Sequence, residues 1–139
     1  MNMRAEDCIF FQLVKAAQAG SRFWSQKVSA LNLTATQAMV LRFLIDRDEV
    51  TSGELGSRAE LDSATLTGIL DRLDTAGIAE RRPNPTDRRT IHIHLTEKGK
   101  EVGKEISRLM GLANAEFLKS MNPLEVKELK RLLGKVREK

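Results

Sequence analysis

The sequence is poor in the residues that build disulfides, metal centres and membrane spans. Its 139 residues include one cysteine, two histidines, three prolines and no tyrosine. A single cysteine, Cys8, excludes an intrachain disulfide and fits a reducing compartment. The longest apolar runs are far shorter than a membrane span, and the N-terminus has no apolar segment followed by a cleavage site. We therefore expect a soluble, cytoplasmic protein without a membrane partner.

The motifs of catalysis and metal binding are also missing. No Ser/His/Asp set, phosphate-binding glycine-rich loop or buried pair of carboxylates can be identified. His92 and His94 form a His-x-His pair, but there is no other histidine, so carboxylates would have to supply further metal ligands. The simpler interpretation is the polar outer face of a strand. We expect no enzyme activity, no cofactor and no metal.

The composition that is present supports one folded domain. Apolar residues make up 41% of the chain and charged residues of both signs 30%, which argues against disorder. The net charge of +4 is mildly basic, which by itself is weak evidence for a nucleic-acid partner. The positions of the basic residues are therefore more informative than their number.

Helical periodicity covers the first third of the chain. Apolar residues recur at three- and four-residue steps over residues 4–30 and predict one helix. Thr34 and Gln37 form a capping box, which opens a second helix that ends near Arg47. Its expected inward side chains are Met39, Val40, Phe43 and Leu44.

Two short helices joined by a tight turn are expected next. After a very short strand at 50–51, Ser52 is expected to cap a helix over 53–59, and Asp62 or Ser63 caps the following one. Gly77 ends that second helix in the left-handed conformation. Two helices separated by a three-residue turn form a helix-turn-helix.

A basic hairpin follows this motif. Residues 79–82 and 90–95 are predicted as two antiparallel strands, and residues 83–87 between them have the Pro, Asn and Asp content of a turn. The hairpin carries Arg81, Arg82, Arg88 and Arg89. Guanidinium groups on a protruding hairpin can reach phosphates or enter a minor groove. The alternative is a solvent-exposed hairpin kept soluble by its charge.

These elements predict a surface that contacts double-stranded DNA. The outward side of the second short helix bears hydroxyls, which can bond phosphates or base edges, and Gly68, which allows close approach of the backbone. The helix has no Asn or Gln, so we expect modest base readout, with the hairpin and DNA shape supplying much of the specificity. The predicted DNA-binding residues are Ser63, Ala64, Thr65, Thr67, Gly68, Arg72, Arg82, Asp87, Arg88 and Arg89.

The two ends of the chain predict a helical dimerisation region. A long helix is expected from Thr96 to about Met121, and Asn122 with Glu125 caps a last one. The first and last two helices have large apolar faces that one copy cannot cover, and a second copy is the economical solution. We assign residues 1–32 and 104–139 to dimerisation and residues 33–103 to a winged helix-turn-helix.

The segment Asp87–Gly99, which reads DRRTIHIHLTEKG, resembles the wing signature of the MarR family of transcriptional regulators. The resemblance extends over about residues 33–99. It implies a mainly α fold with a small β-wing, and an obligate homodimer that binds a pseudo-palindromic operator and usually represses. It also implies that Arg89 enters the minor groove, that Asp87 is its ion-pair partner, and that a ligand bound between the dimer platform and the DNA-binding lobe causes release.

Two further features leave alternatives open. A small aromatic or phenolic effector would suit a pocket walled by Phe23, Trp24, Met39 and Phe43, although these side chains also suit a plain core. One branch of the family senses hydroperoxides through a cysteine in the first helix. That cysteine depends on nearby tyrosines, which this chain lacks, and Cys8 lies about two residues too early, so a packed, inert thiol is the simpler interpretation.

Two other classes of function are compatible with the same elements. The winged helix could be a protein- or RNA-interaction module whose basic wing is incidental. The protein could also bind DNA constitutively without sensing a ligand. DNA binding and ligand response separate these alternatives.

Overall fold

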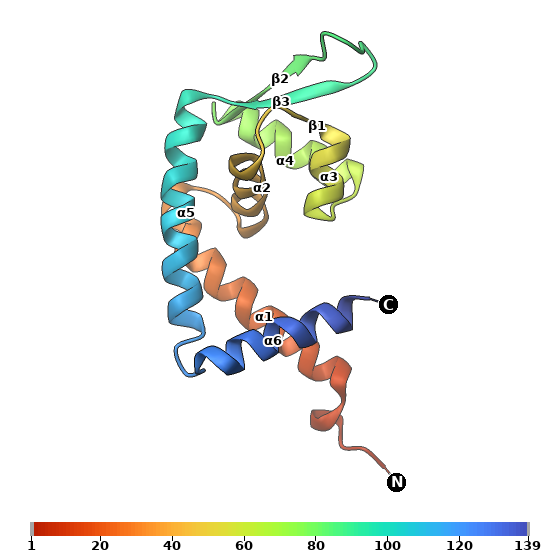
Figure 1. Cartoon of the computed structure of the whole chain (residues 1–139), viewed down its shortest axis with the longest axis vertical. Helices are drawn as coiled ribbons and strands as arrows, with labels where there is room; N and C mark the ends of the chain where they lie inside the picture. The colour runs from red at the N-terminus through yellow and green to blue at the C-terminus, as the bar shows by residue number, and fades with distance from the viewer. Residues whose placement is uncertain (1, 139) are drawn as a thin grey trace.

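The computed structural model of the protein describes residues 2–138 and consists mostly of helices with one small sheet (Figure 1). In chain order the elements are η1 (Ala5–Asp7), α1 (Ile9–Val28), η2 (Ser29–Leu31), α2 (Ala35–Asp46), β1 (Val50–Thr51), α3 (Ser52–Ala59), α4 (Ser63–Thr75), β2 (Ala79–Pro83), β3 (Ile91–Leu95), α5 (Glu97–Phe117) and α6 (Pro123–Arg137). This order confirms the predicted winged helix-turn-helix with additional helices on both sides.

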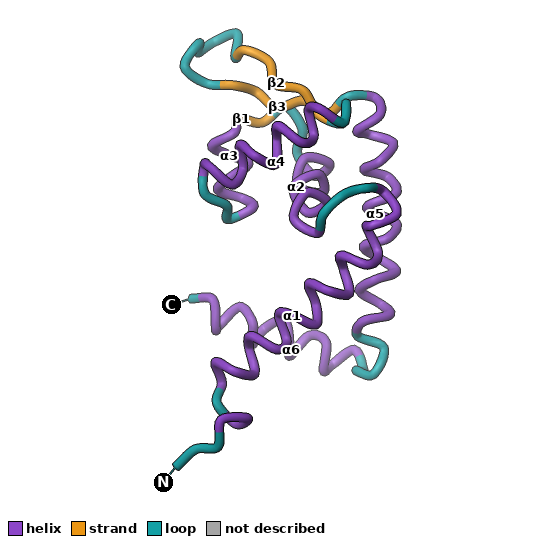
Figure 2. The backbone as a smooth tube through the Cα atoms, turned by 180° about the vertical axis from the view of Figure 1, so that it is seen from behind, coloured by secondary structure: helices purple, strands orange, loops and turns teal. Residues whose placement is uncertain are grey.

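The elements form a lobe at one end of the molecule, and α1 and α6 lie at the other. Helices α2, α3 and α4 and the sheet make up the lobe, from which the β2–β3 hairpin protrudes (Figure 1). Helix α5 runs from the base of the hairpin to the other end, where α1 and α6 lie, and both termini lie at that end (Figure 2). The hairpin is therefore at the opposite end from the termini.

Most of the predicted helix boundaries are confirmed by their capping hydrogen bonds. Thr34 and Gln37 make both bonds of the capping box, each 3.1 Å long, and Asn122 and Glu125 make the equivalent pair ahead of α6. The cap of α3 was assigned wrongly: Thr51 Oγ1, and not Ser52, accepts the N–H of Glu54 at 3.1 Å.

The ends of two longer helices also differ from the prediction. The expected helix over 4–30 is interrupted at Cys8, whose extended backbone (ψ 128°) separates η1 from α1. At its C-terminal end the helix continues into the tighter turn η2. Asn32, which follows η2, has a left-handed backbone conformation with φ 57° and ends the helical segment. Helix α5 ends at Phe117, four residues before the expected Met121.

The core of the lobe is formed by aliphatic side chains from every element around it. Fully buried members include Leu41, Leu44, Leu55, Leu73, Ile93 and Ile106. Val40 and Leu44 face inward as predicted, but Met39 is 39% exposed, because it faces the space toward α6 and not the lobe. Ile91 shares the inner strand face with Ile93, yet it is 45% exposed, since the hairpin extends beyond the core at this point.

The sheet has the order β1-β3-β2, with both pairs antiparallel. The register places Val50 opposite Ile93, Ala79 opposite Leu95 and Pro83 opposite Ile91. Strand β3 is thus central, and it ends directly at the start of α5. The hairpin is connected to the long helix without a flexible linker.

A close contact joins the end of α4, the start of β2 and the start of α5. The carbonyl oxygen of Ile78 accepts the N–H of Thr96 at 3.1 Å, and the Thr96 hydroxyl donates to the adjacent Gly77 carbonyl at 2.5 Å. The N-terminal turn of α5 lies so near that a Cβ atom on Gly99 would be 1.9 Å from the Ile78 carbonyl oxygen. Only glycine therefore fits at this position.

We expect Gly99→Ala to lower the free energy of unfolding by about 2 kcal/mol. The added methyl group forces the backbone of α5 away from the Ile78 carbonyl, at a cost of about 3 kcal/mol. The better helix propensity of alanine offsets about 1 kcal/mol of this cost. Urea unfolding followed by circular dichroism measures the change.

Gly68→Ala is the matched control, since Gly68 also lies within a helix but has no atom within 4 Å of the place that a Cβ would occupy. That variant should gain about 1 kcal/mol. Equal effects of the two substitutions would contradict the proposed contact.

Candidate nucleic-acid interface

Helix α4 has a well-defined beginning and end. Asp62 Oδ1 accepts the N–H of Thr65 at 2.7 Å, and at the other end Gly77 has φ 73°. The N–H of Ile78 donates to the Leu73 carbonyl at 2.9 Å, which together with Gly77 completes a Schellman motif. The side chain of Lys98, from α5, donates to the Ala76 carbonyl at 2.8 Å. Helix α4 is therefore held at both termini.

The predicted DNA-binding residues of α4 lie together on its solvent side. The inner side chains Leu66, Ile69, Leu70 and Leu73 are buried, and the following residues are exposed: Ser63, Ala64, Thr65, Thr67, Gly68 and Arg72. Within residues 2–138, Arg72 makes neither an ion pair nor a side-chain hydrogen bond. The outward surface of α4 is thus small and polar, with one guanidinium group.

The hydroxyl groups of two threonines on this surface are already bonded within the protein. Thr65 Oγ1 donates to Asp62 Oδ2 at 2.9 Å, and Thr67 Oγ1 donates to the Ser63 carbonyl at 2.8 Å. The hydrogen bonds from the Thr65 N–H and then from its hydroxyl lower the pKa of Asp62 below its ordinary value. Asp62 is therefore an ionised acceptor near neutral pH.

The tip of the hairpin is organised by Asp87. Its Oδ1 accepts the backbone N–H of Arg89 at 3.0 Å and lies 3.2 Å from Nε of the same residue. The Arg89 side chain is 91% exposed, so its two terminal nitrogens point away from the protein with the ion pair intact. The predicted pair of Asp87 and Arg89 is therefore present in the structure.

The remaining hairpin arginines have different surroundings. Arg88 is exposed at the tip, and Arg82 is paired with Glu80 on its own strand. Arg81 points toward α4, where its guanidinium lies 2.7 Å from Asp71 Oδ1 and 3.4 Å from Asp74 Oδ2. Arg81 is not among the predicted DNA-binding residues. In the structure its ion pairs with Asp71 and Asp74 join β2 to α4.

No local sequence pattern could have identified this contact of Arg81. The two aspartates are three residues apart on one helical face, but their partner lies beyond the chain reversal at Gly77. The pairing depends on how β2 packs on α4, which sequence spacing alone does not specify.

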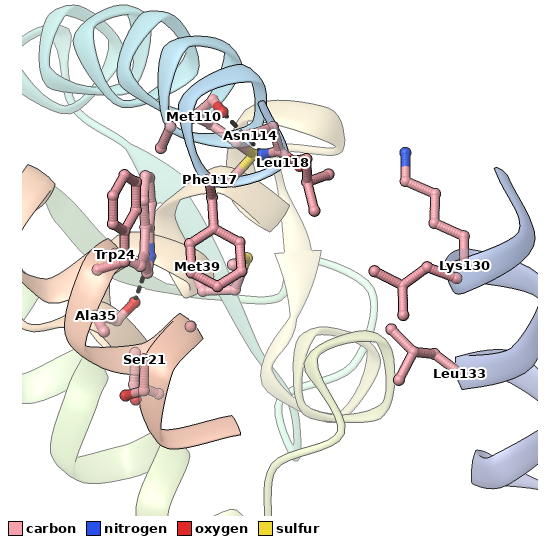
Figure 3. A pocket seen from close by; sticks show the side chains of 15 residues that line it. Ser21, Trp24, Ala35, Met39, Met110, Asn114, Phe117, Leu118, Lys130 and Leu133 are labelled. Carbon is pink, nitrogen blue, oxygen red and sulfur yellow. Dashed lines mark hydrogen bonds between the residues drawn. The ribbon is translucent and has the colours of Figure 1, made fainter. Parts of the chain in front are cut away.

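A cavity of about 640 Å³ lies between α1, α2, α5 and α6 (Figure 3). Of the four side chains proposed from the sequence for an effector pocket, Phe23, Trp24 and Met39 line this cavity, whereas Phe43 lies outside the lining and packs under the Arg58 guanidinium, 5.5 Å from the ring centroid. Trp24 Nε1 donates to the Ala35 carbonyl at 3.2 Å, which leaves the apolar part of the indole facing the cavity. Lys130 and Leu133 of α6 lie across the opening from these residues (Figure 3).

The two histidines and Cys8 lie outside the lining of this cavity. His92 and His94 have ring centroids 6.1 Å apart, and His94 Nδ1 lies 3.6 Å from Glu49 Oε1. Cys8 is half-buried at the start of α1.

Within residues 2–138, no single helix has both the length and the apolar content needed to cross a membrane. Only residues 9–31 and 35–46 taken together, which form a bent pair of helices, have that length and apolar content.

Comparison with known proteins places the whole chain among transcriptional regulators. Residues 31–90 match the MarR family. The chain is 34% identical over 137 residues to the HTH-type transcriptional regulator MgrA of Staphylococcus aureus, covering 97% of this chain and 90% of that protein.

Solved structures agree with this assignment. A mutant of Escherichia coli MarR complexed with operator DNA superimposes with a TM-score of 0.86 at 31% identity, covering 98% of this chain and 99% of that one. The Bordetella bronchiseptica protein BpsR has a TM-score of 0.92 at 23% identity, covering 100% and 99%, which supports the fold. The chain belongs to the MarR family: it is a DNA-binding transcriptional regulator with a winged helix-turn-helix, and not an enzyme.

Proposed function

We propose that the protein is a homodimeric repressor that binds a pseudo-palindromic operator and is released by a small aromatic or phenolic ligand. In this proposal residues 33–103 contact DNA, and residues 1–32 and 104–139 hold the two copies together. The two α4 helices enter successive major grooves about 34–36 Å apart, and the hairpins enter the flanking minor grooves. The site of action is the cytoplasm.

The observation that carries the DNA-binding part is the geometry of the hairpin tip. The Arg89 side chain is 91% exposed, its Nε lies 3.2 Å from Asp87 Oδ1, and it belongs to the segment that joins β2 and β3 at the tip of the hairpin. The negative potential of a narrow minor groove favours an arginine presented in this way. The exposed residues of α4 occupy the adjacent surface and suit the major groove.

Replacing the wing arginine should weaken operator binding without unfolding the protein. We expect Arg89→Ala to cost about 1–3 kcal/mol of specific binding free energy, because it removes a contact made only with DNA. Fluorescence anisotropy on a duplex selected from a random pool measures the affinity.

Arg108→Ala is the control, because Arg108 also forms an exposed ion pair, with Glu105 at 2.5 Å, but lies on α5 away from the hairpin. A second variant, Asp87→Ala, should weaken binding in the wild type and add little to Arg89→Ala. An Arg89→Ala protein with unchanged operator affinity would refute the assigned role.

The dimer is supported by apolar side chains that one copy leaves uncovered. On α1, Ile9, Phe10 and Val14 are 58%, 73% and 53% exposed, and no described residue of α6 is buried. Exposed apolar surface of this extent on a regulator marks an interaction face. Its position at the end opposite the hairpin leaves both DNA-contacting surfaces accessible.

A charge on the apolar face of α6 should dissociate the dimer. We expect the wild type to sediment with the mass of two chains. Leu133→Glu should sediment with the mass of one chain or form aggregates, because the carboxylate would be buried without a partner in the dimer. Sedimentation equilibrium measures the mass. Lys127→Glu, on the opposite side of the same helix, should remain dimeric, and a wild type that sediments as a stable monomer would exclude this assembly.

The cavity beside Trp24 supports the ligand-release part of the proposal. Its walls are mainly aromatic, methionine and leucine side chains, with Lys130 at the opening as the cation that a carboxylate would need. It also lies between the terminal helices and α2 of the lobe, so a bound ligand would contact both parts (Figure 3).

Titration with phenolic carboxylates should change Trp24 fluorescence and lower operator affinity together, because the indole lines the cavity. Met39→Trp should fill the space and abolish both responses while leaving ligand-free operator binding intact. The control is Met3→Trp, since Met3 is 71% exposed and outside the cavity. Insensitivity of the wild type to every ligand class would instead favour a constitutive regulator.

A further inference from the structure

The hydrogen bonds of Thr65 and Thr67 restrict what α4 can offer to a base edge. A backbone carbonyl cannot donate, so in the contact with Ser63 the Thr67 hydroxyl must supply the hydrogen, at an O–O distance of 2.8 Å. The carboxylate of Asp62 is ionised near neutral pH and also accepts only, so the Thr65 hydroxyl is the donor at 2.9 Å. Each of these hydroxyls has a single hydrogen, and each is therefore already used.

The groups that these two side chains can present outward are acceptor lone pairs and methyl groups. Their neighbours Ala64 and Gly68 have no side-chain hydrogen-bonding group, Ser63 has one hydroxyl at the first residue of the helix, and Arg72, the one side chain of α4 rich in donors, lies more than a turn beyond Thr67. The first part of α4 thus has acceptors and methyl groups at its surface and few donors.

The major groove contains an edge complementary to this set. An A·T pair presents the N6 amino group of adenine, which is a donor, and the C5 methyl group of thymine. A G·C pair has an amino group on cytosine, but guanine presents two acceptors there and the pair has no methyl group. We infer that Thr67 selects A·T pairs in the operator by accepting from an adenine amino group and packing on a thymine methyl group.

This inference rests on the proposed operator binding and adds which bases α4 selects. It also assigns the readout to the methyl group and lone pairs of Thr67, and not to its hydroxyl hydrogen. Thr67 also borders a groove between α3 and α4 lined by Ser52 and Gly53, so contact with a phosphate is the competing possibility. A phosphate contact would be insensitive to base identity, which makes the two distinguishable.

The experiment is a thermodynamic cycle on the full-length protein. Duplexes are selected from a random pool with the wild type and again with Thr67→Ser, which removes the methyl group, and Thr67→Val, which removes the lone pairs. The base pairs whose selection changes with these variants are those that Thr67 contacts. Thymine at those positions is then replaced by uracil, and in separate duplexes adenine by purine without the amino group.

We expect A·T pairs at those positions in the wild-type selection. Uracil should weaken wild-type and Thr67→Val binding about fourfold, the factor that one buried methyl group gives, and should leave Thr67→Ser unaffected. Removal of the adenine amino group should weaken the wild type and Thr67→Ser more than Thr67→Val. Thermal unfolding and binding to an unselected duplex, both expected to be unchanged, show that the variants remain folded.

The remaining outcomes overturn the inference in distinguishable ways. A G·C preference at the affected positions, or equal losses for each variant on all duplexes including the unselected one, would refute base selection by Thr67 and leave the proposed operator binding intact. Failure of the wild type to select any sequence would refute both.

Discussion

The relative positions of the DNA-contacting elements depend on one carbonyl group, that of Ile78. Helix α4 ends just before it, strand β2 begins just after it, and the N–H of Thr96 at the start of α5 donates to it. The absence of a side chain at Gly99 lets α5 approach this close, and Lys98 from the same turn binds the end of α4. These contacts join α4, the hairpin and α5 at one point.

Most arginines of the hairpin are paired with carboxylates, which limits the unpaired positive charge available for nonspecific attraction to DNA. Three of the hairpin arginines have carboxylate partners: Arg81 with Asp71 and Asp74, Arg82 with Glu80, and Arg89 with Asp87. These pairs offset much of the local positive charge, consistent with a net charge of only +4. Nonspecific binding driven by counterion release should accordingly be modest, and specificity must depend on where individual groups lie.

Local signals predicted most of this architecture, because capping boxes, strand alternation and Gly77 act within a few residues of where they occur. Some errors were local, such as the cap of α3 and the ends of α1 and α5, but the other features that escaped prediction depend on packing between separate elements. Arg81 meets its aspartates only after the chain reverses, Phe43 turns toward Arg58 and not the cavity, and Ile91 is exposed although its alternation is that of a buried residue. The direction of the Thr67 hydroxyl likewise requires coordinates, since threonine in a helix can orient in more than one way.

The ion pair at the wing tip has a consequence for conformational entropy. An unrestrained arginine has about 2 kcal/mol of rotamer entropy to lose when it is immobilised. Asp87 holds the Arg89 backbone N–H and Nε from one oxygen, so much of that freedom is already absent in the unbound protein, while the terminal nitrogens stay available. Arg88, its exposed neighbour without such a restraint, would lose more on ordering. Of two adjacent arginines with the same charge, the one that is already paired is thus the better suited to bind DNA tightly.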